Sequence, residues 1–301
     1  MHSTSPYFTV FTPTYNRAHT LHGVYKSLCD QTFTDFEWVI VDDGSEDTTE
    51  RLVREWERQN KILIRYFKQE NQGKHSAHNF GVDNANGYLF LVFDSDDRCV
   101  PSALETFRYY WEDIPVKIRS KFSTLSCLCM NHSGHIIGPE YPSLVCDIFS
   151  LKKQLAFRSG GGRWGVNTVQ SMRENKFPIF AGETFIPESL IWNRISSQYG
   201  ARFINKPLRI VESLEGGLSA TSVSIRIKSP RGTLLTYNEQ MSLPLGFGKR
   251  MRSALNYVRF SIHARCLVLL LKVTLTNPMV LLALPGGVAL YCRDKFNLTP
   301  E

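Results

Sequence analysis

The sequence lacks an apolar run long enough to cross a membrane as a helix. Two apolar runs lie near the C-terminus, but Lys272 ends the run Cys266–Leu271 and Pro285 interrupts the run Met279–Tyr291. A spanning helix needs about 20 apolar residues in succession. The N-terminus also lacks the basic and apolar segments of a signal peptide. We therefore expect neither a transmembrane helix nor secretion.

Cysteine does not form a disulfide framework. The seven cysteines are odd in number and scattered, which favours a reducing cytosol. Cys127 and Cys129 are followed by His132 and His135, all of which are zinc-ligand types, but their spacing is tighter than in the usual zinc finger. We predict no zinc site.

Acidic residues are scarce in the C-terminal part of the chain. Of the net charge of +7, residues 249–301 carry +6 and residues 1–248 only +1. Aliphatic runs separate the basic residues of this tail, a mixture that fits a membrane surface better than nucleic acid. We expect interfacial helices anchored by Lys and Arg. A re-entrant hairpin and packing on another protein are the alternatives.

Short apolar strands alternate with helices in the first hundred residues. The expected strands are 8–12, 36–41, 62–67 and 88–93, and the expected helices are 19–30, 45–60 and 73–85. Strands without polar alternation are typical of buried parallel strands. The pattern predicts an α/β fold with a doubly wound, mostly parallel sheet.

The rhythm changes after residue 120. We expect a hairpin over 122–137, a mobile Gly-rich loop over 159–165, helices over 187–199 and 228–241, and a strand over 202–211. The Gly-rich loop fits Gly-x-Gly-x-x-Gly, but it does not follow a first strand and so predicts no dinucleotide site. The predicted parts are 1–120 for donor binding, 121–245 for acceptor binding and 246–301 as an amphipathic helical tail.

Acidic residues follow two of the expected strands. Asp42 and Asp43 end the second strand, and Asp94, Asp96 and Asp97 end the fourth. Ligands of open α/β sheets bind beyond the carboxyl ends of the strands. Crowded carboxylates need a cation or hydrogen-bond donors, and Mg²⁺ or Mn²⁺ bound with substrate phosphates meets that need. The sequence therefore predicts an enzyme that acts on a nucleoside-diphosphate compound.

Residues 9–104 closely resemble the family 2 glycosyltransferases of the GT-A fold. Five segments carry the resemblance, in family order and spacing: Phe11–Arg17, Gln31–Phe33, Trp38–Ser45, Asn79–Gly81 and Gly87–Asp97. The resemblance implies a nucleotide-sugar donor, with a UDP-sugar preferred, and a divalent cation that offsets the charge of the departing nucleoside diphosphate.

The resemblance also implies roles for single residues. Asp43 resembles the aspartate that accepts hydrogen bonds from the donor base, and Thr12 and Tyr15 resemble the wall around that base. Asp96 resembles the direct metal ligand of the Asp-x-Asp motif, and Asp94 a partner of the ribose or of the metal's surroundings.

Two further residues near this edge have open roles. Asp97 matches either role of the Asp-x-Asp motif, and the sequence does not separate them. Lys74, with His75 and His78, lies at the start of the expected third helix. Contact with the diphosphate and a solvated helix face are both consistent with that position.

An inverting transfer needs a base that takes the proton of the acceptor hydroxyl. The pattern Trp192-Asn-Arg194 resembles the family's aromatic-x-Arg pattern and places Glu188 at the base position, although many relatives have Asp there after another acid. Glu183 is the competitor. A carboxylate that stabilises a helix N-terminus would occupy the same place. In the Gly-rich loop, Trp164 is a candidate stacking platform for the acceptor, and a plain surface loop is the alternative.

These features predict an inverting glycosyltransferase of polysaccharide or glycolipid synthesis. It would transfer a sugar to a lipid-linked saccharide at the cytoplasmic face of the cell membrane, as a peripheral protein without nucleic-acid partners. A sugar-nucleotide nucleotidyltransferase is the second hypothesis, although the chain lacks the glycine-rich basic N-terminal loop of those enzymes. An inactive membrane-associated binding module is the third, and the intact Asp-x-Asp argues against it.

Overall fold

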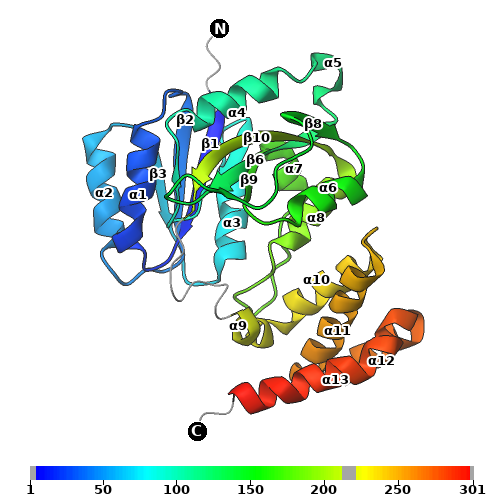
Figure 1. Cartoon of the computed structure of the whole chain (residues 1–301). Helices are drawn as coiled ribbons and strands as arrows, with labels where there is room; N and C mark the ends of the chain where they lie inside the picture. The colour runs from blue at the N-terminus through cyan, green and yellow to red at the C-terminus, as the bar shows by residue number, and fades with distance from the viewer. Residues whose placement is uncertain (1–4, 212–221, 299–301) are drawn as a thin grey trace. The chain divides into compact units, whose positions relative to one another are not determined.

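The protein folds into two compact units. The computed structural model describes residues 5–211 and 222–298. One unit comprises Met1–Lys176 and Ile191–Leu214, and the other comprises Phe177–Leu190 and Glu215–Glu301 (Figure 1). The predicted donor-binding part, residues 1–120, thus lies wholly in the first unit. The predicted acceptor-binding part, residues 121–245, lies in that unit only as far as Lys176 and again from Ile191 to Leu214. The predicted boundary at 245 falls within the second unit, and the last three residues of the predicted tail lie outside the described residues.

The N-terminal strands form the predicted parallel half of one mixed sheet. They are β1 (Phe8–Thr14), β2 (Phe36–Asp42), β3 (Leu63–Lys68) and β4 (Leu89–Val92), in the spatial order β3-β2-β1-β4. All three pairings among them are parallel. Because the strands are parallel, their carboxyl ends share one edge of the sheet.

The sheet continues through strands from later in the chain. They are β5 (Arg98–Cys99), β6 (Phe122–Met130), β7 (Ile136–Ile137), β8 (Val145–Ile148), β9 (Arg163–Thr168) and β10 (Gly200–Ile210). After β4 the order is β9-β6-β10-β5, with β7 on β6 and β8 on β10. The β6–β7 pairing is antiparallel, so the expected hairpin is confirmed.

The expected mobile loop over 159–165 is wrong in its second half. β9 starts at Arg163 and pairs antiparallel with both β4 and β6 in the middle of the sheet. Gly165 permits this close approach, because a Cβ at this position would collide with the Leu125 carbonyl oxygen. The glycine that suggested a loop therefore serves the packing of a strand.

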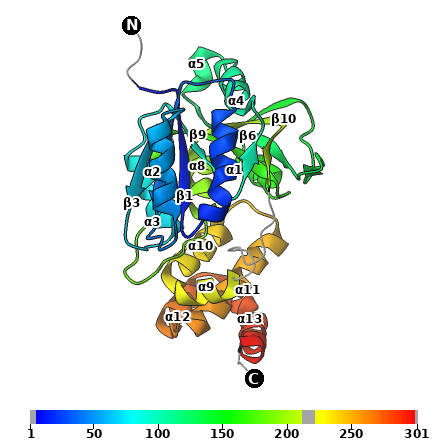
Figure 2. The ribbon, with the colours of Figure 1, turned by 90° about the vertical axis from the view of Figure 1, so that its left-hand side faces the viewer.

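Helices cover both faces of the sheet. One face packs on α1 (Ala18–Cys29), α2 (Thr49–Gln59) and α4 (Ala103–Glu112), and the other on α3 (Lys74–Asp83), α7 (Val169–Glu174) and α8 (Ser189–Gln198). Figure 2 shows α1 and α2 in front of the sheet. The short helices α5 (Val116–Arg119) and α6 (Leu151–Arg158) complete this unit.

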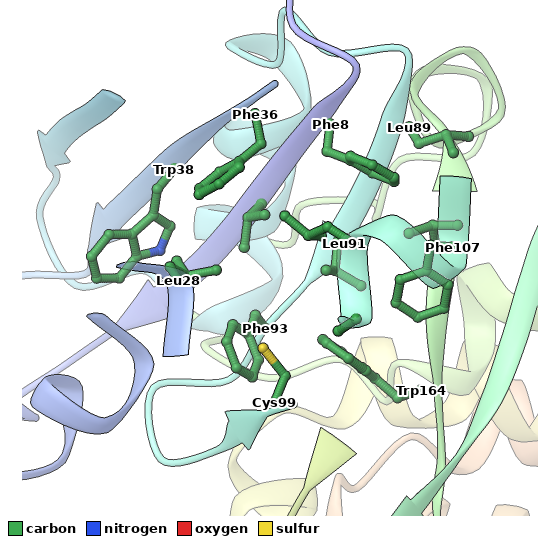
Figure 3. Packing of buried hydrophobic residues seen from close by; sticks show 14 of the residues in the cluster. Phe8, Leu28, Phe36, Trp38, Leu89, Leu91, Phe93, Cys99, Phe107 and Trp164 are labelled. Carbon is green, nitrogen blue, oxygen red and sulfur yellow. The ribbon is translucent and has the colours of Figure 1, made fainter. Parts of the chain in front are cut away.

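The apolar strands supply both cores at once. Successive residues of β2 alternate, so Trp38 and Ile40 join the core beneath α1 and α2, whereas Val39 and Val41 join the core beneath α3. Phe8 and Trp38 are labelled in the first of these cores in Figure 3. This two-sided burial explains why the strands show no polar alternation.

The second unit is helical. It contains α9 (Ser222–Lys228), α10 (Pro230–Ser242), α11 (Phe247–His263), α12 (Leu267–Thr276) and α13 (Pro278–Leu298). α10, α11, α12 and α13 enclose a separate apolar core. A buried ion cluster joins α11 to α13, where Asp294 pairs with the Arg259 guanidinium and lies 3.0 Å from His263 Nε2. In the described part of the chain, no helix is both long and apolar enough to cross a membrane.

Candidate active site

The carboxyl ends of β1, β2 and β4 bring the predicted polar segments together. The register aligns Thr14 with Asp42 and Phe11 with Val92, so the loops that follow these strands are neighbours. Asn16 fastens the first two loops. Its N–H donates to Ser45 Oγ at 2.8 Å, and its φ of 53° is one that asparagine tolerates well.

The two aspartates after β2 have different surroundings. Asp42 is fully buried and accepts hydrogen bonds from the Tyr66 hydroxyl at 2.5 Å and the Ser45 N–H at 2.7 Å. Asp43 accepts from the backbone N–H groups of Gln72 at 2.9 Å and Gly73 at 2.7 Å. Asp43 therefore fixes the loop that leads into α3, at the edge where the resemblance places the donor base.

Thr12 is a core residue. Its side chain is fully buried, and its hydroxyl accepts a hydrogen bond from Trp38 Nε1 at 2.9 Å. This corrects the expected place of its side chain in the wall around the base, because that wall must be open to a ligand. Tyr15 is half-exposed at the end of β1, and its contact with the base stays a prediction.

Asp94 lies between two cations. Lys74 Nζ donates to Asp94 Oδ1 at 2.7 Å, and Arg209 donates to Asp94 Oδ2 at 3.0 Å. Burial by itself would raise the pKa of Asp94, but these two charges outweigh burial and lower the pKa below its usual value. Asp94 is therefore a carboxylate whose orientation the protein already fixes.

Asp97 and Asp96 differ from each other in burial and in ion pairing. Asp97 is buried and forms an ion pair with Arg209, although burial still raises its pKa to about 7. Burial, and then the charge of Asp94, also raise the pKa of Asp96, while Arg17 opposes them. No ion pair is recorded for Asp96 in the described part of the chain. Arg209 already pairs with Asp94 and Asp97, so Asp96 is the carboxylate of the cluster that remains for a divalent cation.

The residues present fit a divalent cation whose binding requires the phosphates of the donor. Within residues 5–211 and 222–298, no group of three or more His, Cys, Asp and Glu side chains is placed to hold a metal. Mg²⁺ usually binds through one or two carboxylates, substrate phosphates and water, so it does not need such a group. Asp96 with the phosphates of a donor would meet this requirement. Cys127 and Cys129 are buried in β6.

Arg209 is the site residue that the sequence did not reveal. It lies near the end of β10, opposite Cys99 of β5, and so reaches a cluster more than a hundred positions earlier in the chain. A lone arginine in a strand carries no motif. The pairing of β10 with β5 and β6 brings it to Asp94 and Asp97.

We expect Arg209→Gln to lower the free energy of unfolding by about 3–5 kcal/mol, because it leaves the buried Asp97 without its cation. Adding Asp97→Asn should restore part of this loss, with a coupling free energy of about 0.5–3 kcal/mol. Urea unfolding of the two single variants and the double variant measures this coupling. Arg51→Gln, on the exposed side of α2, is the control. Additive losses would show that Arg209 does not stabilise Asp97.

The two candidate bases, Glu183 and Glu188, belong to the second unit. Glu183 is buried, and its two carboxylate oxygens accept from the N–H groups of Arg231 at 2.7 Å and Gly232 at 2.9 Å. Glu183 thus caps the N-terminus of α10. Glu188 is exposed and directly precedes α8. The contacts therefore favour Glu188 over Glu183 as a group that can reach an acceptor.

The expected stacking role of Trp164 is wrong. Trp164 lies in β9, is buried, and donates from Nε1 to the Val92 carbonyl at 2.7 Å. Its ring packs against Phe93 and Phe107 in the core shown in Figure 3. A side chain enclosed in this way cannot stack on a sugar.

The parallel strands, with acidic side chains at their carboxyl ends, define an α/β domain with an acidic edge. Residues 9–118 match the family model described as Glycosyl transferase family 2. A Campylobacter jejuni protein named GalNAc(5)-diNAcBac-PP-undecaprenol beta-1,3-glucosyltransferase is 35% identical over 209 residues, which are 68% of this chain and 64% of that protein. An uncharacterized glycosyltransferase of Rickettsia felis is 29% identical over 221 residues, which are 69% of this chain and 33% of that protein. The chain thus spans from a third to just under two thirds of these relatives.

Solved structures show the same fold. S. aureus TarS 1-349 in complex with UDP-GlcNAc superposes with a TM-score of 0.57 and 18% identity, covering 93% of this chain and 80% of that chain. The mannosyltransferase PcManGT from Pyrobaculum calidifontis, in complex with GDP-Man and Mn²⁺, gives 0.56 and 16%, covering 97% and 89%. The fold is GT-A. Residues 9–118 form a domain that is similar to the glycosyltransferases of family 2.

Proposed function

We propose that the protein is an inverting, metal-dependent glycosyltransferase that moves a sugar from a nucleotide-diphosphate sugar to a lipid-linked saccharide. The acidic edge of the sheet carries this proposal. Lys74 and Arg209 hold Asp94, which leaves Asp96 to face the donor phosphates. A UDP-sugar is the preferred donor, although the two structural neighbours above bind UDP-GlcNAc and GDP-Man.

The residues of the chain would divide the chemistry between them. Asp43 and Tyr15 would orient the donor base, and Asp94 would orient the ribose. Asp96 would hold Mg²⁺ or Mn²⁺, which offsets the negative charge that develops on the departing nucleoside diphosphate. Glu188 would take the proton from the acceptor hydroxyl as that oxygen attacks the anomeric carbon. One base and one displacement imply inversion at that carbon.

The acceptor and the location are proposed from two observations. The Campylobacter relative is named for an undecaprenol-linked acceptor, and the C-terminal part of this chain is strongly basic. Anionic lipids of the cytoplasmic leaflet attract basic surfaces by about 1 kcal/mol per Lys or Arg. We therefore place the protein peripherally on the inner face of the membrane, in polysaccharide or glycolipid synthesis.

A panel of nucleotide sugars tests the proposal. Each donor is incubated with Mg²⁺, with Mn²⁺ or with a chelator, and release of the nucleoside diphosphate is measured. We expect release from one donor, dependent on the cation, and a β-linked product by NMR when an α-linked donor is used with a lipid-linked acceptor. Pyrophosphate exchange without sugar release would identify a nucleotidyltransferase instead. A product with retained configuration would contradict the single displacement.

A further inference from the structure

The helix α12 turns aliphatic side chains to the outside. Leu270 packs into the core of the second unit, as expected for a surface helix. The opposite side carries Leu267, Val268, Leu271 and Leu275, whose exposed fractions range from 55% to 87%. A surface helix normally places charged or polar residues there. α12 therefore has two apolar sides, of which the core covers one.

The helix α13 has a second exposed apolar stripe. Leu281, Leu282, Val288 and Phe296 are exposed by 44% to 83% and recur at helical spacing. Pro285, Ala289 and Cys292, which share this spacing, are exposed as well. Val280 and Ala283 face the core instead. The apolar stripe thus extends over most of α13.

The two stripes belong to neighbouring helices. α12 and α13 pack against each other, and both pack against α11. The exposed patch is therefore formed by adjacent helices rather than by isolated side chains. Apolar patches of this kind mark interaction sites.

Charge identifies the partner. Residues 241–293 contain no Asp or Glu and carry seven Lys or Arg: Lys249, Arg250, Arg252, Arg259, Arg265, Lys272 and Arg293. Asp294, the next acidic residue, is buried in its ion pair with Arg259. The outside of α11, α12 and α13 therefore presents cations together with exposed aliphatic side chains, which complements a surface of anionic headgroups over acyl chains.

The position of Lys272 favours a lipid partner over a protein partner. It is exposed among Leu271, Leu275 and Val268 on α12. An apolar protein interface over these leucines would bury the ammonium group at a large cost. At a bilayer surface, the butyl stem of the lysine can follow the leucines inward while the ammonium stays among the phosphates. This arrangement favours the bilayer.

We propose that the outer sides of α12 and α13 are the surface by which the protein docks on an anionic bilayer. The leucines enter the boundary between headgroups and acyl chains, and Arg265, Lys272 and Arg293 remain at the phosphates. With 10 residues, α12 is about 15 Å long and lies within the interface. The inference rests on the proposed membrane location and deepens it by naming the docking surface.

Vesicle flotation with the full chain tests this surface. The vesicles contain phosphatidylcholine alone or with phosphatidylglycerol. We expect Leu275→Asp to lower partitioning onto the mixed vesicles by about tenfold, and Leu275→Asp with Leu282→Asp by about a hundredfold. Both side chains are exposed, so thermal unfolding should stay unchanged. Leu144→Asp, at an exposed leucine in the other unit, is the control and should partition like the unsubstituted protein.

The result can overturn the proposal in two ways. Partitioning that is the same in all these variants would exclude the patch as the lipid contact. Self-association without vesicles that is lost in Leu275→Asp would identify a second copy of the chain as the partner. Donor hydrolysis in vesicle-free buffer is measured on the same samples. It reports on the proposed enzyme alone, so its failure and the failure of docking are distinguishable.

Discussion

Replacing Asp96 with asparagine is expected to lower the rate of sugar transfer by at least about a hundredfold. The amide removes the charge that would hold the cation, and a Lewis acid at a departing diphosphate contributes several kcal/mol to the reaction. Folding should change little, because Asp96 is partly exposed and has no recorded ion pair in the described residues. Steady-state kinetics at several Mn²⁺ concentrations measures the first effect and thermal unfolding the second.

Calorimetric titration with Mn²⁺ and the nucleoside diphosphate provides a readout that does not depend on turnover. We expect cation-dependent binding to be lost in Asp96→Asn. Asp35→Asn is the matched control, since Asp35 is exposed and precedes β2 at the end of the sheet away from the cluster. Near-normal activity of Asp96→Asn would refute the metal assignment. Equal loss in Asp97→Asn, with an unchanged fold, would mean that both residues hold the cation.

Replacing Glu188 with glutamine should lower transfer by about 10²–10⁴-fold, the usual contribution of a general base. Glutamine keeps the length and polarity of the side chain but cannot take the proton of the acceptor hydroxyl. Donor binding should persist, because the proposed donor residues belong to the loops after β1, β2 and β4. Single-turnover transfer, together with calorimetric binding of the nucleotide sugar, separates the two effects.

Glu183→Gln is the comparison variant that distinguishes the two candidate bases. Glu183 accepts two backbone N–H groups at the start of α10, so its loss should cost about 1 kcal/mol of stability, as for other helix caps. Transfer by the folded fraction should remain close to that of the unsubstituted protein. A larger loss of transfer in Glu183→Gln than in Glu188→Gln would reverse the two assignments.

The alternating strands and helices were predictable because their signals are local. Residues 38–41 are apolar throughout, since the strand is buried on both faces, and two aspartates follow where the chain leaves the sheet. The family segments lie in the same part of the chain. The sequence therefore predicts the first four strands, and it also predicts which loops lie together at the edge.

The surroundings of three side chains could not be predicted, because they are set by residues far away in the sequence. Trp164 lies just after three glycines, which are typical of a loop. β9, however, pairs with both β4 and β6, and the Trp164 ring is buried. Thr12 is polar and precedes a motif, yet its hydroxyl accepts a hydrogen bond from Trp38 Nε1 of the neighbouring strand. Arg209 reaches the acidic cluster through the pairing of β10 with β5 and β6. None of these partners is near in sequence.

The ion cluster of Asp294 sets a practical limit on shortening the chain from its C-terminus. Asp294 is close to the end of α13, yet it compensates Arg259 in the middle of α11. A chain cut just before Asp294 would leave a buried guanidinium without its carboxylate, which is worth about 3–5 kcal/mol. Such a truncation would loosen α11 as well as the removed turn. Shorter versions for crystallisation should therefore keep Asp294, or lose α11, α12 and α13 together.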